Sequence, residues 1–73
     1  MQQMAYRRIG ASVVACRNRI GMIQAQVADR AGISRGQLAN IESGRYGFSI
    51  HTLKAIAQVL RVKVWEILKT ADL

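Results

Sequence analysis

The sequence has 73 residues, which is enough for one small domain with a limited hydrophobic core. A single cysteine, Cys16, excludes an internal disulfide and indicates a reducing cytoplasm, while no apolar run reaches the roughly 18 residues of a membrane span and no signal-peptide pattern opens the chain. Eleven Lys and Arg residues against four Asp and Glu give a net charge of +7, so the expected partner is a polyanion, with nucleic acid ahead of a membrane surface.

Apolar residues recur at helical spacing from the start of the chain, and they predict a first helix followed by a shorter second one. The stripe of the first helix consists of Ile9, Val13, Cys16 and Ile20, and that of the second consists of Ile23, Val27, Ala28 and Ala31. Gly21 and Gly32 are expected to end these helices, because glycine readily adopts the left-handed conformation found at helix C-termini. Cys16 is therefore expected in the core.

The later helices are marked by N-terminal caps as well as by apolar spacing. Ser34 and Gln37 form the capping-box pattern, in which each side chain bonds the other's backbone N–H, and Gly44 is expected to end this third helix. Ser49 is the expected N-cap of a fourth helix, and a turn over 61–63 leads to a short fifth. The apolar residues of these three helices are Ile33, Leu38 and Ile41; Ile50, Leu53, Ile56, Ala57 and Leu60; and Val64, Ile67 and Leu68. We therefore expect an all-α fold, a compact bundle of four to five short helices.

The second and third helices are joined by the very short connection RAGIS, residues 30–34. A short helix, a glycine, one apolar residue, an N-cap and a second short helix form the layout of a helix-turn-helix. Gly32 permits the sharp reversal, and Ala28 leaves room where the two helices would cross. A helical hairpin without any ligand would contain the same turn, so the turn alone leaves a purely structural interpretation open.

The chain resembles the helix-turn-helix family of phage repressors, Cro proteins and xenobiotic-response-element regulators. The matching segments are IGASVVACR at 9–17, QAQVADRAGIS at 24–34, LANIESG at 38–44 and LKAIAQVLRV at 53–62. The resemblance implies a lambda-repressor-like fold, and we expect one DNA-binding domain over 1–73 with a core at about 7–69 and a flexible segment at 1–6. The chain departs from the family at Ile23, where Ser or Thr usually caps the second helix, at Phe48, which replaces a proline, and at Arg61, where a glycine often ends the fourth helix.

The resemblance also implies that the third helix is the recognition helix and that its exposed face contacts bases. Arg35 could bind a guanine and Asn40 an adenine with two hydrogen bonds each, while Gly36 would let the helix approach DNA closely. Gln37 ranks lower as a base contact because the capping box could use its side chain. The expected phosphate contacts are Gln24, Arg45, Tyr46 and Arg19. An ordinary polar role for Gln24 and mere tolerance of Gly36 remain alternatives.

Other residues are expected to be structural. The resemblance pairs Arg17 with Glu42, and a carboxylate that follows the apolar Ile41 needs a partner if it is buried. A homodimer interface is expected at the apolar C-terminal end, at Val62, Val64, Trp65 and Leu68. His51 has no Cys or His cluster around it, so no metal site and no cofactor are expected.

These observations predict a cytoplasmic, sequence-specific regulator that binds double-stranded DNA as a homodimer on a two-fold-related operator. No nucleophile–base pair, carboxylate pair or phosphate loop occurs in the sequence, so an enzyme is not expected. The main alternative is an antitoxin-like chain that neutralises a toxin-like partner protein and autoregulates through DNA binding. A basic helical module that binds RNA or DNA without sequence preference is a third interpretation.

Overall fold

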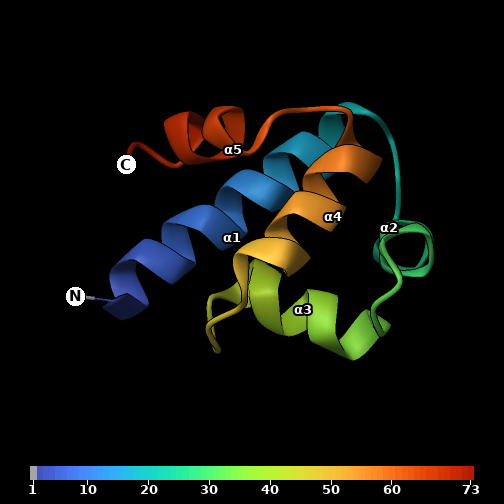
Figure 1. Ribbon diagram of the computed structural model, residues 1–73, viewed down its shortest axis with the longest axis horizontal. Coiled ribbons are helices and arrows are strands. Elements are labelled where there is room, and N and C mark those ends of the chain that lie inside the picture. The colour runs from blue at the N-terminus through green and yellow to red at the C-terminus, as the bar shows by residue number, and fades with distance from the viewer. Residues whose placement is uncertain (1) are drawn as a thin grey trace.

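A computed structural model describes residues 2–73, which form five helices and contain no strand (Figure 1). The helices are α1 (Gln2–Arg19), α2 (Gln24–Ala31), α3 (Arg35–Ser43), α4 (Ile50–Leu60) and α5 (Val64–Thr70). The expected all-α bundle is therefore confirmed. Helix α1 begins well before Ile9, the first residue of its expected apolar stripe. The stripe does not mark this early start because residues 2–8 are mostly polar.

The glycines between the helices end them as expected. Gly32 has φ +74° and Gly44 has φ +70°, and both lie in the left-handed region that glycine adopts without steric cost. Each is followed by a backbone N–H that bonds back into the helix, Ile33 to the Ala28 carbonyl at 3.0 Å and Arg45 to the Asn40 carbonyl at 3.1 Å. These bonds satisfy carbonyls that the helix itself leaves unpaired.

The capping box expected at α3 is only half formed. The Ser34 hydroxyl accepts a hydrogen bond from the Gln37 backbone N–H at 3.0 Å, but the Gln37 side chain makes no return bond within residues 2–73. The prediction was wrong on this point because an exposed amide bonds water as readily as a backbone N–H. The reverse half occurs at α2, where the Gln26 side-chain oxygen accepts from the Ile23 N–H at 3.1 Å and partly replaces the missing Ser or Thr cap.

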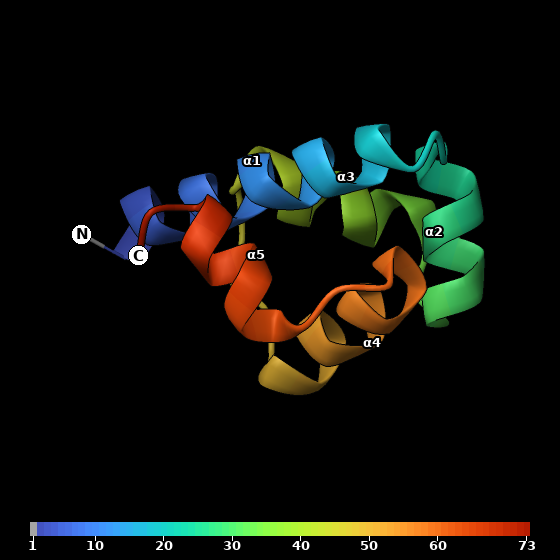
Figure 2. The same ribbon diagram turned by 90° about the horizontal axis from the view of Figure 1, so that it is seen from above.

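The core lies where the helices enclose one another. Helix α3 packs on α1 and α2, helix α2 also packs on α4, and α5 packs on α1 and α4. Figure 2 shows α5 lying across the space between α1 and α4. The largest side chains with no more than 1% exposure are Leu38, Ile56, Leu60, Ile67, Val13 and Val27. Helices α3 and α5 both pack on α1 and lie on opposite sides of it (Figure 1).

Several apolar residues on the expected stripes lie on the surface instead. Ile20, Ile23 and Ile50 are exposed, because each lies at a helix end, where the chain turns away from the core. The loop between α3 and α4 separates its two aromatic residues. Phe48 packs against the core and meets the ring of Tyr6 edge-on at 5.3 Å, whereas Tyr46 is exposed.

Helix α1 approaches α3 very closely at Gly10. A Cβ atom at Gly10 would clash with the Ile41 carbonyl oxygen and would lie 2.6 Å from the Glu42 carbonyl oxygen. Helix α1 is also tied to α5, because the buried Ser12 hydroxyl donates to the Ile67 carbonyl at 2.7 Å. These two contacts fix α3 and α5 to opposite faces of α1.

Arg61, where the family often has glycine, ends α4 in the left-handed conformation with φ +60°. A side chain in this region costs on the order of 1 kcal/mol. We therefore expect Arg61→Gly to stabilise the protein by about 0.5–1 kcal/mol and to raise Tm by roughly 2–8 °C. Arg61→Ala, which removes the same charge but keeps a Cβ, is the control in thermal unfolding. A rise in Tm for both variants would trace the effect to charge and not to backbone strain.

Candidate nucleic-acid interface

The first turn of α3 presents the residues expected to contact bases. Arg35, Gly36 and Gln37 are exposed, and Asn40, one turn further on, is half-buried. A Cβ atom at Gly36 would meet only the Ser34 hydroxyl, at 4.0 Å, so the space in front of this turn is open. Because the Gln37 side chain takes no part in the cap, it remains available beside Arg35 for a contact with a ligand.

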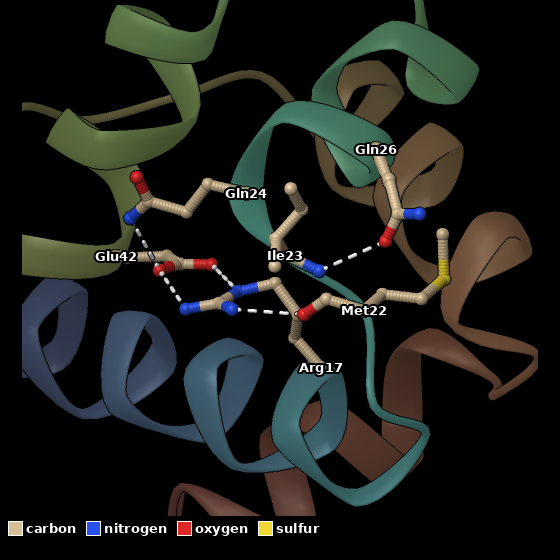
Figure 3. A network of polar contacts seen from close by, with 6 residues as sticks. All are labelled: Arg17, Met22, Ile23, Gln24, Gln26 and Glu42. Carbon is tan, nitrogen blue, oxygen red and sulfur yellow. Dashed lines mark hydrogen bonds and ion pairs between the residues drawn. The ribbon is translucent and has the colours of Figure 1, made fainter.

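Glu42 is the centre of a buried polar network behind this helix (Figure 3). Its side chain is 4% exposed and accepts three hydrogen bonds. Arg17 donates two of them, from Nε at 2.8 Å and from Nη2 at 3.0 Å, so the pair expected from the sequence is bidentate. Gln24 donates the third from Nε2 at 2.8 Å. One carboxylate therefore joins α1, α2 and α3.

Arg17 is held on its other side as well. Its Nη1 donates to the Met22 carbonyl at 2.9 Å, which attaches α1 to the segment before α2. Hydrogen bonds to Glu42 and the attraction of its charge raise the pKa of the Arg17 guanidinium, although burial works in the opposite direction. A raised pKa stabilises the folded state below the ordinary arginine value, and this contribution is lost only as pH rises through the raised value. The Arg17 guanidinium is therefore charged throughout the physiological range.

The bond from Gln24 to Glu42 was not anticipated from the sequence. Gln24 was expected to donate to a DNA phosphate, and the structure commits one N–H of its amide to Glu42. The second N–H and the amide oxygen are left for a ligand, and the side chain is half-buried. The sequence contained a hint of a second donor to Glu42, because a carboxylate offers more acceptor positions than one arginine fills. The contact itself depends on the crossing of α2 over α3.

The other expected contacts lie apart from the network. Arg45 and Tyr46 are exposed in the loop after α3, and Arg19 is exposed at the end of α1. At the expected dimer surface, Val62, Val64 and Leu68 are half-buried and pack against the core. Trp65 is 61% exposed, with Lys69 Nζ 5.9 Å from its ring centre.

The exposed face of α3 carries groups suited to binding a polyanion. Residues 2–73 hold no group of three His, Cys, Asp or Glu side chains arranged to bind a metal. None of the helices described for this part of the chain is long and apolar enough to cross a membrane. An open helix face with amide and guanidinium groups, on a chain of net charge +7, is suited to hydrogen bonding and charge attraction with a polyanion.

Comparisons with known proteins agree with this geometry. A family model described as helix-turn-helix matches residues 13–64. The immunity repressor protein of Bacillus phage phi105 is 39% identical over 56 residues, which cover 77% of this chain and 39% of that protein. The chain thus spans about two fifths of the length of this curated relative.

Solved structures show the same arrangement of helices. The clp gene regulator ClgR from Corynebacterium glutamicum matches with a TM-score of 0.89 and 25% identity, over 93% of this chain and 88% of that one. The restriction-modification controller protein C.AhdI from Aeromonas hydrophila has a TM-score of 0.83 at 21% identity, over 85% of this chain and 94% of that one. These proteins are regulators and not enzymes. The chain therefore belongs to the helix-turn-helix family of phage-repressor-like, DNA-binding transcriptional regulators.

Proposed function

We propose that this chain is a cytoplasmic transcriptional regulator that binds a specific double-stranded DNA sequence as a homodimer. The observation that supports this most directly is the exposed first turn of α3, with Arg35, Gly36 and Gln37 in front of open space. In helix-turn-helix proteins the N-terminal residues of the second helix contact base edges in the major groove.

The expected roles divide along α3 and its surroundings. Arg35 would bind guanine O6 and N7, and Asn40, one turn beyond Gly36 on the side of Gly36, would bind adenine. Gly36 would allow the backbone to approach the bases, because no side chain stands in the way. Gln24, held by Glu42, would direct its remaining amide N–H to a phosphate beside the groove.

The homodimer is proposed from the surface of α5. Trp65 is a large exposed side chain on α5, and Val62, Val64 and Leu68, on this helix or just before it, are only half-buried. Helix α5 packs on α1 and α4, whereas α3 packs on α1 and α2, so a second copy on α5 would leave the face of α3 uncovered. Two copies would then read half-sites about one helical turn apart, ~34 Å.

Selection of bound sequences from a random pool of DNA duplexes tests this proposal, with the selection run at two salt concentrations. Enrichment of a motif with two-fold symmetry is the expected result. An asymmetric motif would argue against the homodimer, and no enrichment at either salt concentration would overturn sequence-specific binding. An antitoxin-like role remains the alternative, and purification of the tagged chain from cells that also express the neighbouring gene product would detect a stable partner.

Substitutions of Arg35 and of Gln24 are expected to affect DNA binding in different ways. Arg35→Ala is expected to lose about 1–3 kcal/mol of binding free energy on the preferred site and to relax the preference at one base pair. Gln24→Ala is expected to weaken binding to all sequences alike, because phosphates carry no sequence information. Binding titrations on the selected duplex and on single-base variants measure both. A uniform loss for Arg35→Ala, or a changed preference for Gln24→Ala, would exclude the corresponding role.

A further inference from the structure

Helix α1 carries two adjacent exposed arginines, Arg7 and Arg8, that the contacts proposed above do not use. Successive residues of a helix point about 100° apart, so the two side chains face different surroundings. Arg8 lines a groove with Thr70 and Asp72, next to α5. Arg7 instead meets the segment that follows the recognition helix.

The contact of Arg7 with this segment is close. A Cβ atom at Gly44 would lie 2.6 Å from Arg7 Cγ and 2.7 Å from the Arg7 backbone nitrogen. Gly44 is buried and ends α3, and the next residue is the exposed Arg45. The aliphatic stem of Arg7 therefore packs across Gly44, the residue that directly precedes Arg45. Figure 1 shows the α3–α4 loop beside the first turns of α1.

A second contact keeps this junction in place. A Cβ atom at Gly47 would lie 2.9 Å from the Tyr6 hydroxyl oxygen, and the Tyr6 ring packs edge-on against Phe48. The loop is thus fixed to α1 at both of its ends, by Arg7 at Gly44 and by Tyr6 at Gly47 and Phe48. The positions of Arg7 and Arg45 relative to α3 follow from this packing.

No carboxylate neutralises these two arginines within residues 2–73. The ion pair of the described structure joins Arg17 to Glu42, whose oxygens already accept three hydrogen bonds. An anion held by both guanidinium groups would offset the repulsion between their charges. Guanidinium groups match the geometry of phosphate oxygens.

The junction is also at a suitable place for a DNA backbone. Helix α3 has nine residues and is ~13 Å long. Its first turn would lie among the bases, so its C-terminal end would stand out of a groove that is about 8.5 Å deep. The DNA phosphates lie along the rims of the groove, at the level of the C-terminal end of α3.

We propose that Arg7 and Arg45 together bind one DNA phosphate at the junction of α1 with the α3–α4 loop. This inference rests on the proposed function and adds to it a contact from the start of α1. Arg8, on the side of α5, takes no part in the site.

The test compares Arg7→Gln with Arg8→Gln, which change the net charge equally and keep a long polar side chain. On the duplex that the wild-type protein selects, Arg7→Gln is expected to weaken binding about five- to ten-fold near 0.1 M salt. It is also expected to reduce the slope of log K against log salt by about 0.9, with the selected sequence unchanged. Arg8→Gln is expected to weaken binding less than about two-fold, because the Arg8 charge would act on the DNA only from a distance and through salt screening.

Arg45→Gln and the double variant Arg7→Gln/Arg45→Gln test whether the site is shared. If both arginines bind one phosphate, the double variant loses less than the product of the two single losses. Losses that multiply would overturn the shared site, and equal losses for Arg7→Gln and Arg8→Gln would overturn a local contact by Arg7. A wild-type protein that selects no sequence would overturn the proposed function, whereas normal selection with an unaffected Arg7→Gln would overturn this inference alone. Thermal unfolding of each variant confirms that the folded protein is compared.

Discussion

Gly10→Ala is expected to destabilise the protein by roughly 2 kcal/mol or more, although alanine is the better helix former. Helix propensity alone would favour alanine in α1 by about 1 kcal/mol. The added Cβ would, however, clash with the Ile41 carbonyl oxygen and lie 2.6 Å from that of Glu42, and both atoms belong to the backbone of α3. Backbone cannot turn aside as a flexible side chain can, so α1 and α3 would have to separate. Overpacking of this kind typically costs about 1–3 kcal/mol and leaves core side chains displaced.

Gly36→Ala is the matched control for this prediction. The exchange is the same and also lies in a helix, but the nearest atom to the new Cβ is 4.0 Å away. We expect the stability of Gly36→Ala to stay within about 0.5 kcal/mol of the wild type or to rise. Urea unfolding followed by circular dichroism measures both variants. Equal stability of Gly10→Ala and Gly36→Ala would contradict the close approach of α1 to α3.

Glu42→Ala is expected to be the most damaging single substitution, with a loss of about 3–5 kcal/mol. It would leave the Arg17 guanidinium, whose side chain is only 13% exposed, without its partner and would also release Gln24. A domain of this size has a total stability of about 4–11 kcal/mol, so much of it would be lost. The midpoint of urea unfolding is expected to fall accordingly.

The double variant Arg17→Met/Glu42→Leu distinguishes the net contribution of the ion pair to stability from the cost of leaving one of its charges unpaired. Removing both charges together leaves no unpaired group in the core, so most of the stability is expected to return. DNA binding is expected to remain weakened, because Gln24 would no longer be held. A double variant as unstable as Glu42→Ala would show that the loss comes from packing and not from the unpaired charge.

Local signals in the sequence located most of the helices. Glycine at positions 32 and 44 ends α2 and α3 in the left-handed conformation, because the conformational preference of glycine acts without distant contacts. The Ser34 cap acts within one turn for the same reason. Apolar spacing was a less reliable signal near the ends of helices. Ile23 and Ile50 fit their apolar stripes by spacing and are nevertheless exposed, because spacing does not say where the core stops.

For the candidate site too, some features follow from the sequence and others only from the tertiary structure. The sequence by itself determined the charge, the all-α class and the order of residues along α3, since each depends on residue type and short-range spacing. Only the tertiary structure decided that Gln24 bonds Glu42, that Gly10 lets α3 approach α1, and that Arg7 lies across Gly44 and not beside α5. These contacts join residues distant in the chain, and their geometry depends on how the helices cross, which no local pattern specifies.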